Sequence, residues 1–221
     1  MNTNIDTTIY QLNKVDNLAI FSQIEKKIIT LDKFKSQKNP SLIIIGGQPG
    51  SGKSTLCSSI QDGLTSDNNA LFIDMDELRE YHPKYKFINK NNDKYAALYT
   101  GPDAGKWSEL LLRSAANKKY NIVYESTLKN TETICLMVQS FAKSGYNVSL
   151  QMIVVKPEIS QVSTYLRYEL LKDAQGYGRF VIPKYHDDSV ANIPKTLQAL
   201  KEQGLISKIE LFTRDKSLFQ G

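Results

Sequence analysis

The chain alternates between short apolar runs and longer stretches in which apolar residues recur every three or four positions. The clearest run covers residues 41–45, Ser-Leu-Ile-Ile-Ile, and is rich in β-branched residues. An unbroken apolar run of this length is typical of a strand that is covered on both faces, as in a parallel sheet. Similar runs predict later strands at residues 70–73, 121–124, 147–155 and 208–212.

The stretches between the strands carry the 3.6-residue period of amphipathic helices. A first helix is predicted by five residues at this spacing: Leu18, Phe21, Ile24, Ile28 and Leu31. We expect it to end at residues 38–40, because Pro40 resists helix continuation. Later helices are predicted around Leu56, Ile60 and Leu64, around Trp107, Leu110, Leu111 and Ala115, around Ile134, Met137 and Phe141, and over residues 159–172 and 183–203. We expect Pro194 to break the last of these in two.

Strands separated by helices predict an α/β fold, in which an open, mostly parallel sheet carries helices on both faces. We expect this domain to cover residues 41–221, and a helical segment to precede it over residues 1–40. Residues 93–106 have the least regular pattern. We interpret them as a mobile substrate loop.

The composition is that of an ordinary globular chain, with 41% hydrophobic and 23% charged residues among 221. No apolar run approaches the ~18 residues that a membrane span needs. The N-terminal stretch carries Asp6 where an export signal would carry basic residues. The two cysteines, Cys57 and Cys135, fall in helical patterns, which predicts free thiols in a reducing compartment. We therefore expect a cytoplasmic protein with no membrane partner.

The formal net charge of +5 comes from lysines scattered singly and in pairs. Such a pattern predicts mostly solvated surface, and the excess suits an acidic protein or a phosphate-rich ligand. No dense basic run indicates a nucleic-acid partner. His82 and His186 lie far from the cysteines in sequence, so no zinc pattern exists, and we expect both histidines to be structural.

Residues 47–54, Gly-Gln-Pro-Gly-Ser-Gly-Lys-Ser, fit the phosphate-binding pattern G-x-x-x-x-G-K-[ST] at every fixed position. They follow a predicted buried strand and open a predicted helix, which favours a nucleotide site over a merely structural turn. The glycines let backbone N–H groups face phosphate oxygens. Lys53 supplies a charge for the β- and γ-phosphates, and Ser54 offers a hard oxygen ligand to Mg²⁺. We expect ATP and Mg²⁺ as cofactors, with nucleotide contacts from Gly47, Gln48, Pro49, Gly50, Ser51, Gly52, Lys53 and Ser54.

The class of phosphate-loop protein depends on residues outside this loop. A switch GTPase would carry a base-reading N-K-x-D after a later strand, where this sequence has none. Residues 72–83 instead read Phe-Ile-Asp-Met-Asp-Glu-Leu-Arg-Glu-Tyr-His-Pro, and residues 122–128 read Ile-Val-Tyr-Glu-Ser-Thr-Leu. They are followed by Arg167-Tyr-Glu, Gly178-Arg and Pro183-Lys-Tyr-His-Asp.

In their order and spacing these segments resemble the zeta toxin family, which has I-D-x-D followed by H-P, a strand ending in E-x-T, and an arginine pair. The resemblance covers the chain from about Ile43 to the C-terminus. It implies a P-loop kinase of the nucleotide-kinase type that phosphorylates UDP-N-acetylglucosamine, or a related UDP-sugar, at the 3′ hydroxyl. It also implies a toxin that blocks bacterial cell-wall synthesis and is restrained by a small antitoxin. We expect the antitoxin to block the nucleotide site and to direct acidic groups at this basic chain.

The resemblance also assigns catalytic roles to residues of this chain. Asp76 matches the family's proposed base, while Asp74 suits a helix cap or an outer-shell Mg²⁺ role. Arg167 and Arg179 match the lid arginines, whose guanidinium groups can address several phosphate oxygens at once. With Lys53 they complete the expected catalytic set. A helix cap is the alternative for Asp76, and a surface ion pair is the alternative for Arg167.

Substrate contacts are expected from Glu109, Glu125, Thr127 and Lys129. Glu109 lies sixteen residues before Glu125, like the family's substrate glutamate, although a solvated helical glutamate is the alternative. Glu125 follows a strand and suits either Mg²⁺ or sugar. Thr127 suits a substrate hydrogen bond or a helix cap, and Lys129 stands where many members of the family have arginine.

Two other functions fit the same loop. One is a kinase whose acceptor is an antibiotic, a nucleoside or a nucleic-acid end, because residues 84–106 match no family pattern. The other is an NTP-dependent switch without a phosphorylated product. An assay for the phosphorylated acceptor distinguishes these two functions from a UDP-sugar kinase.

Overall fold

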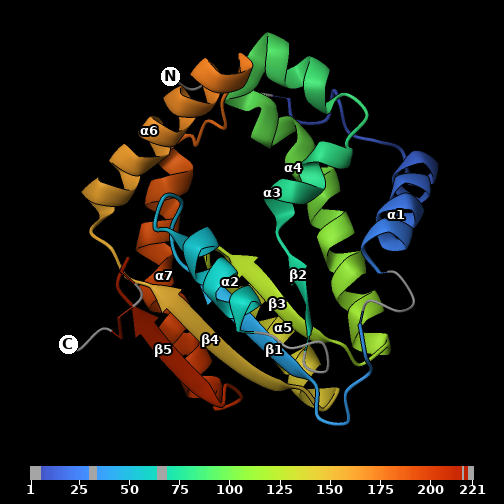
Figure 1. The fold of residues 1–221 in the computed structure, drawn as a ribbon, viewed down its shortest axis with the longest axis vertical. Coiled ribbons are helices and arrows are strands. Elements are labelled where there is room, and N and C mark those ends of the chain that lie inside the picture. Colours follow the sequence, from blue (N-terminus) through green and yellow to red (C-terminus); the bar gives the residue numbers. More distant parts are fainter. Residues whose placement is uncertain (1–5, 30–33, 64–68, 216, 219–221) are drawn as a thin grey trace.

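The computed structural model describes residues 6–29, 34–63, 69–215 and 217–218. Five parallel strands form one sheet in the order β2-β3-β1-β4-β5 (Figure 1). The strands are β1 Ser41–Gly46, β2 Ala70–Ile73, β3 Asn121–Ser126, β4 Asn147–Ile153 and β5 Lys208–Phe212. Each lies where an apolar run predicted it, so the α/β fold and the parallel sheet are confirmed.

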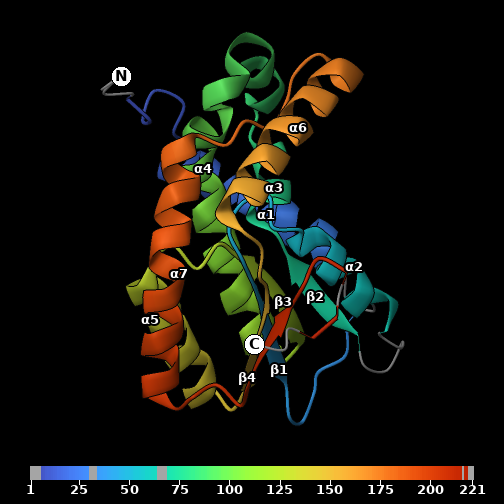
Figure 2. The same cartoon turned by 90° about the vertical axis from the view of Figure 1, so that its left-hand side faces the viewer.

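Helices connect the strands and pack around the sheet (Figures 1 and 2). They are α1 Lys14–Ile28, α2 Lys53–Asp62, α3 Met75–Leu78, α4 Tyr85–Asn117, α5 Thr131–Lys143, α6 Pro157–Gln175 and α7 Pro183–Gln203, with a 3₁₀ turn at Arg79–Tyr81. None of the described helices combines the length and the apolar character that crossing a bilayer requires.

The sheet is covered on both faces, which explains the unbroken apolar run of β1. Successive side chains of a strand point to opposite faces. Ile44 belongs to a core cluster that includes Trp107 of α4 and Val138 of α5. The next residue, Ile45, belongs to a second cluster that contains Leu56 of α2. Both faces therefore bury apolar side chains.

Helix α1 packs against α4 and contributes to the larger core cluster through the fully buried Ile24. The indole Nε1 of Trp107 donates to the carbonyl oxygen of Asn17 at 3.0 Å. A buried indole usually needs such a partner. This contact fixes the position of α1 along α4.

The prediction of a mobile loop at residues 93–106 is wrong. Helix α4 runs through them, and its backbone departs from helical geometry at Asn92, with φ −157° and ψ 60°. The sequence pattern misled for two reasons. Pro102 lies inside the helix, where proline is normally excluded, and the polar Asp103 is fully buried, which interrupts the apolar period.

Two predicted helix boundaries are also wrong. Helix α7 continues through Pro194, because the flanking Ile193 and Thr196 are buried and Thr196 Oγ1 donates to the Leu128 carbonyl oxygen at 2.9 Å. Helix α1 ends at Ile28, well before residues 38–40. The predicted helical residues Leu31 and Leu64 lie outside the described part of the chain.

Candidate active site

The phosphate loop connects the end of β1 to the start of α2, and its backbone conformation requires glycine. Gly50 has φ +76°, and a Cβ atom there would lie 2.2 Å from the carbonyl oxygen of Ser160 in α6. Gly52, which precedes α2, has φ +107°. Other residues rarely adopt these angles. Glycine thus lets the loop lie close against α6.

Lys53 is the first residue of α2, and its ammonium group is folded back onto the loop. Nζ donates to the carbonyl oxygens of Gly47 at 2.9 Å and Gln48 at 3.2 Å. It also lies 3.7 Å from Oε1 of Glu125 at the end of β3. Burial lowers the pKa of Lys53 and raises the pKa of Glu125. A phosphate group would stabilise the buried ammonium.

A cavity of about 510 Å³ opens beside this loop. It lies at the carboxyl ends of parallel strands, where ligands of open α/β sheets bind. Seven predicted catalytic and substrate residues line it: Lys53, Asp76, Glu125, Thr127, Lys129, Arg167 and Arg179. Pro49 and Gly50 of the loop line it as well. The fold therefore joins these groups from five separate stretches of sequence.

Asp74 and Asp76 follow β2 and start the short helix α3. Oδ1 of Asp74 accepts from the backbone N–H of Asp76 at 2.8 Å, so Asp74 is the cap that the sequence suggested. Burial raises the pKa of Asp74, and the nearby Arg179 and Arg79 oppose that shift. The Asp76 carboxylate accepts a hydrogen bond from Arg179 and forms an ion pair with Arg79.

Three guanidinium groups line the cavity, from Arg79, Arg167 and Arg179. Burial lowers the pKa of Arg79 and of Arg167 to about 10, so both stay charged at neutral pH. Nε of Arg167 is buried and finds no hydrogen-bond partner among the described residues. An unpaired buried donor is costly. Such a concentration of positive charge suits an anionic ligand.

Six predicted site residues are not among those that line the cavity: Gly47, Gln48, Ser51, Gly52, Ser54 and Glu109. The side chain of Glu109 is 62% exposed and pairs with Arg113, one turn later on α4, at 2.5 Å. This position agrees with the alternative stated for Glu109, a solvated glutamate on the surface of a helix. Ser54 is exposed on the first turn of α2, beyond the lining residues.

The oxygen groups near the loop fit Mg²⁺ chemically. Ser54 offers a hydroxyl, and Asp74 and Glu125 offer carboxylates, which are the hard donors that this ion prefers. Within residues 6–29, 34–63, 69–215 and 217–218, no cluster of three or more histidine, cysteine or acidic side chains forms a dedicated metal cage.

Residues 26–220 match the family model described as Zeta toxin. The chain belongs to the zeta toxin family. It is 33% identical over 184 residues to Toxin PezT of Streptococcus pneumoniae serotype 4, covering 83% of this chain and 72% of that protein. It is 29% identical to Toxin zeta of Enterococcus hirae, covering 82% of this chain and 63% of that protein.

A solved structure from the PezAT chromosomal toxin–antitoxin system of Streptococcus pneumoniae superposes with a TM-score of 0.82. The two chains are 28% identical, and the superposition covers 96% of this chain and 83% of the other. All the predicted site residues lie inside the zeta toxin match, whereas residues 6–25 precede it.

Sequence reasoning missed two arginines at the site of this zeta toxin family member. Arg79 follows Asp76 by three residues, and that helical spacing was an available signal. Arg214 follows β5, and its Nε donates to the carbonyl oxygen of Ser51 at 3.2 Å while Nη2 donates to Ser163 Oγ at 2.9 Å. It ties the phosphate loop to α6, and only the fold brings it there.

Both histidines are buried in the scaffold, as predicted. Nε2 of His82 lies 3.0 Å from the carbonyl oxygen of Tyr10. Nε2 of His186 lies 2.8 Å from Oγ of Ser160. Neither lines the cavity, so a carboxylate is the better candidate for a base.

Proposed function

We propose that this chain is a kinase that transfers the γ-phosphoryl group of ATP to UDP-N-acetylglucosamine or a related UDP-sugar. By the resemblance to the zeta toxin family, the acceptor is the 3′ hydroxyl. One observation carries the proposal: Lys53, Asp76 and Arg179 line a single cavity that adjoins the phosphate loop.

The phosphate loop and Lys53 bind the triphosphate. Loop N–H groups and the start of α2 face the phosphates, and Lys53 Nζ exchanges its carbonyl partners for phosphate oxygens. The Ser54 hydroxyl and the carboxylates of Asp74 and Glu125 would hold Mg²⁺, which would neutralise phosphate charge. Arg167 and Arg179 compensate the charge that spreads over the transferred group.

Asp76 acts as the base. Its carboxylate accepts the proton of the acceptor hydroxyl while that oxygen bonds to the γ-phosphorus. The bond from the γ-phosphorus to the bridging oxygen breaks, and ADP leaves. The ion pair with Arg79 orients the Asp76 carboxylate for the acceptor, while Arg179 turns to the phosphates.

The cavity beyond the loop suits a nucleotide sugar. Its volume of about 510 Å³ falls within the ~300–1,000 Å³ of small-molecule sites. Leu98, Pro102 and Tyr185 supply apolar walls, while Thr127 and Lys129 supply polar groups. Such sites are mostly apolar, with a few polar groups that fix orientation.

We also propose that the protein is the cytoplasmic toxin of a toxin–antitoxin pair and stops bacterial cell-wall synthesis. The likeness to the PezAT structure supports an antitoxin partner. A net charge of +5 suits an acidic one that covers the nucleotide site. Titrating ATP into the complex tests this, since unaltered ATP binding would reject the blocking mechanism.

The decisive experiment incubates the protein with ATP, Mg²⁺ and a panel of nucleotide sugars, nucleosides, aminoglycosides and oligonucleotides. Mass spectrometry then looks for one added phosphate. We expect it on UDP-N-acetylglucosamine, and we expect its loss in Asp76→Asn. Release of ADP with no modified acceptor would instead favour a nucleotide-dependent switch.

A further inference from the structure

The segment over residues 6–13, here called the N-terminal strap, reaches the cavity although it precedes α1. Thr7 lines the cavity together with Lys94, Leu98 and Gly101 of α4. The strap passes behind the upper turns of α4, at the end of the molecule remote from α2 (Figures 1 and 2). Thr7 therefore belongs to the cavity although it lies far from the phosphate loop in sequence.

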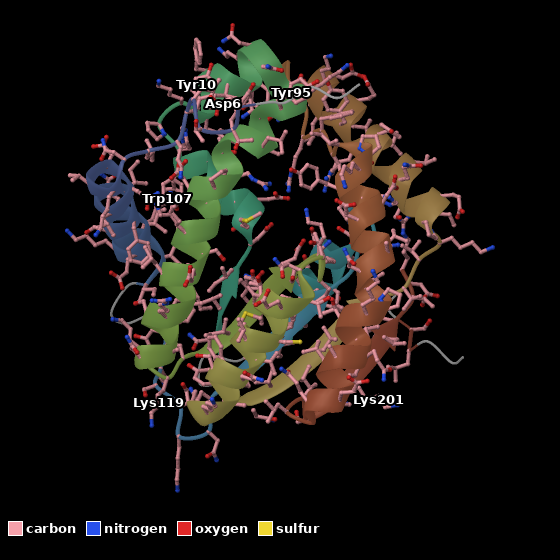
Figure 3. The ribbon with its side chains drawn as sticks, turned by 180° about the vertical axis from the view of Figure 1, so that it is seen from behind. Asp6, Tyr10, Tyr95, Trp107, Lys119 and Lys201 are labelled. Atoms are coloured by element: carbon pink, nitrogen blue, oxygen red, sulfur yellow. The ribbon has the colours of Figure 1, made fainter. Side chains whose placement is uncertain are left out.

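An aromatic contact holds the middle of the strap. The ring of Tyr10 meets the ring of Tyr99 edge-on, with centroids 5.1 Å apart at 80°. It packs against a small buried cluster of Ile88, Ala96 and Tyr99 in the first half of α4. Figure 3 shows Asp6, Tyr10 and Tyr95 together at this end of the molecule. Edge-to-face pairs of this kind add stability beyond the area that they bury.

A buried carboxylate holds the end of the strap. Asp103 of α4 is fully buried, and its Oδ2 accepts from the backbone N–H of Leu12 at 3.0 Å. Its Oδ1 accepts from Nδ2 of Asn17, in α1, at 2.7 Å. A buried carboxylate is costly unless its oxygens are hydrogen-bonded. The backbone N–H of Leu12 in the strap satisfies one of the two Asp103 oxygens. This hydrogen bond fixes the position of the strap along α4.

His82 adds a third attachment. Its buried ring places Nε2 3.0 Å from the carbonyl oxygen of Tyr10. The strap is thus bonded through its backbone at two positions, Tyr10 and Leu12. These contacts make the strap an ordered wall.

We propose that the N-terminal strap forms the acceptor-side wall of the cavity, with Thr7 in contact with the acceptor molecule. The inference rests on the proposed kinase function and names a specificity-determining element that lies before the residues matched by the family model. The Thr7 hydroxyl both donates and accepts hydrogen bonds, which suits the hydroxyl and amide groups of a nucleotide sugar.

The adjacent threonine gives a matched control. Thr8 is exposed, and its hydroxyl donates to Asp6 at 2.6 Å, away from the cavity. The experiment compares Thr7→Trp with Thr8→Trp, using ATP, Mg²⁺ and UDP-N-acetylglucosamine. Thr7→Trp fills the acceptor side, so KM for the sugar nucleotide should rise at least ~10-fold while KM for ATP stays within about two-fold. Thr8→Trp should match the parent in both.

A second variant tests the attachment of the wall. Tyr10→Ala removes the contact with Tyr99 and loosens the strap, so KM for the sugar nucleotide should rise about three- to ten-fold with KM for ATP unchanged. An unchanged ATP constant also shows that each variant is folded.

The parent protein is assayed first, which separates two kinds of failure. A parent that phosphorylates no member of the panel overturns the proposed function and, with it, the acceptor wall. A parent that phosphorylates the sugar nucleotide, with Thr7→Trp equal to Thr8→Trp, overturns the strap inference alone.

Discussion

Arg179 donates a hydrogen bond to the carboxylate of Asp76, which lies 103 positions earlier in the sequence. One residue starts the helix after β2, and the other lies in the segment between α6 and α7. Their contact brings a candidate base and a candidate phosphate ligand together. In a kinase, Arg179 would exchange this carboxylate for phosphate oxygens when ATP enters.

Asp76→Asn should abolish phosphoryl transfer without abolishing ATP binding. The amide keeps the shape of the side chain but accepts no proton as a carboxylate does, so kcat should fall at least ~10³-fold. Product formation followed by mass spectrometry, with a nucleotide titration beside it, measures both effects. Activity within tenfold of the parent would remove Asp76 from the role of base.

The resemblance implies substrate contacts for both Glu109 and Glu125, but only the Glu125 side chain lines the cavity. Glu125→Gln should lower kcat/KM about 100-fold, because its carboxylate lines the cavity beside Lys53. Glu109→Gln should leave kcat/KM within about two-fold, because that side chain is exposed and pairs with Arg113. Steady-state kinetics of both variants measure these effects. A larger loss of kcat/KM in Glu109→Gln would support a substrate contact for Glu109.

The strands and the phosphate loop could be predicted from sequence because their signals are local. The apolar run before Gly47 indicates a strand buried on both faces of a sheet. The phosphate-binding pattern indicates the backbone conformation of the loop that contains it. The helix through residues 93–106 could not be predicted in this way. The hydrogen bonds that satisfy its buried Asp103 come from Leu12 and Asn17, which are far away in sequence.

In the candidate site, too, some residues could be predicted from local motifs and others only from the fold. Asp76 and Arg179 could be named from motifs, but motifs say nothing of which carboxylate an arginine will meet. Thr7 and Arg214 had no pattern at all, since their importance depends on chain segments that meet only in the folded protein. The same holds for Glu109, whose spacing matched the family's substrate glutamate, because only the fold shows its side chain exposed and paired with Arg113.

Arg79 should prove to be a positioning residue for Asp76. Arg79→Met removes the ion pair that remains on Asp76 when Arg179 moves to the phosphates, so kcat should fall about 10- to 100-fold with KM for ATP unchanged. Arg79→Lys should restore part of the loss, because lysine keeps the charge but lacks the planar fork. Arg113→Met, at an exposed pair, is the matched control. Equal kcat values for the parent and Arg79→Met would contradict the role.

Cys57 should be almost inert to alkylation in the folded protein. Burial raises the pKa of its thiol to about 12, with the nearby Glu125 carboxylate as a second cause. Only the thiolate reacts, so at pH 8 the reactive fraction is roughly 10⁻⁴. Iodoacetamide labelling followed by peptide mass spectrometry should show slow modification of Cys57 and fast modification after unfolding in urea. Rapid labelling of the native protein at pH 8 would show that the thiol is not held in this environment.

Gly50→Ala should damage both the stability and the nucleotide site. A Cβ atom there would meet the Ser160 carbonyl oxygen at 2.2 Å, and the backbone has φ +76°. Strain and displacement of the loop from α6 should together lower the free energy of unfolding by about 2–4 kcal/mol. Gly145→Ala is the matched control, because Gly145 has a similar φ of +84° with open space around it. It should cost only about 1 kcal/mol and leave ATP binding intact. Urea unfolding and ATP titration of both variants give the comparison, and equal losses would mean that backbone strain, not the contact with α6, shapes the loop.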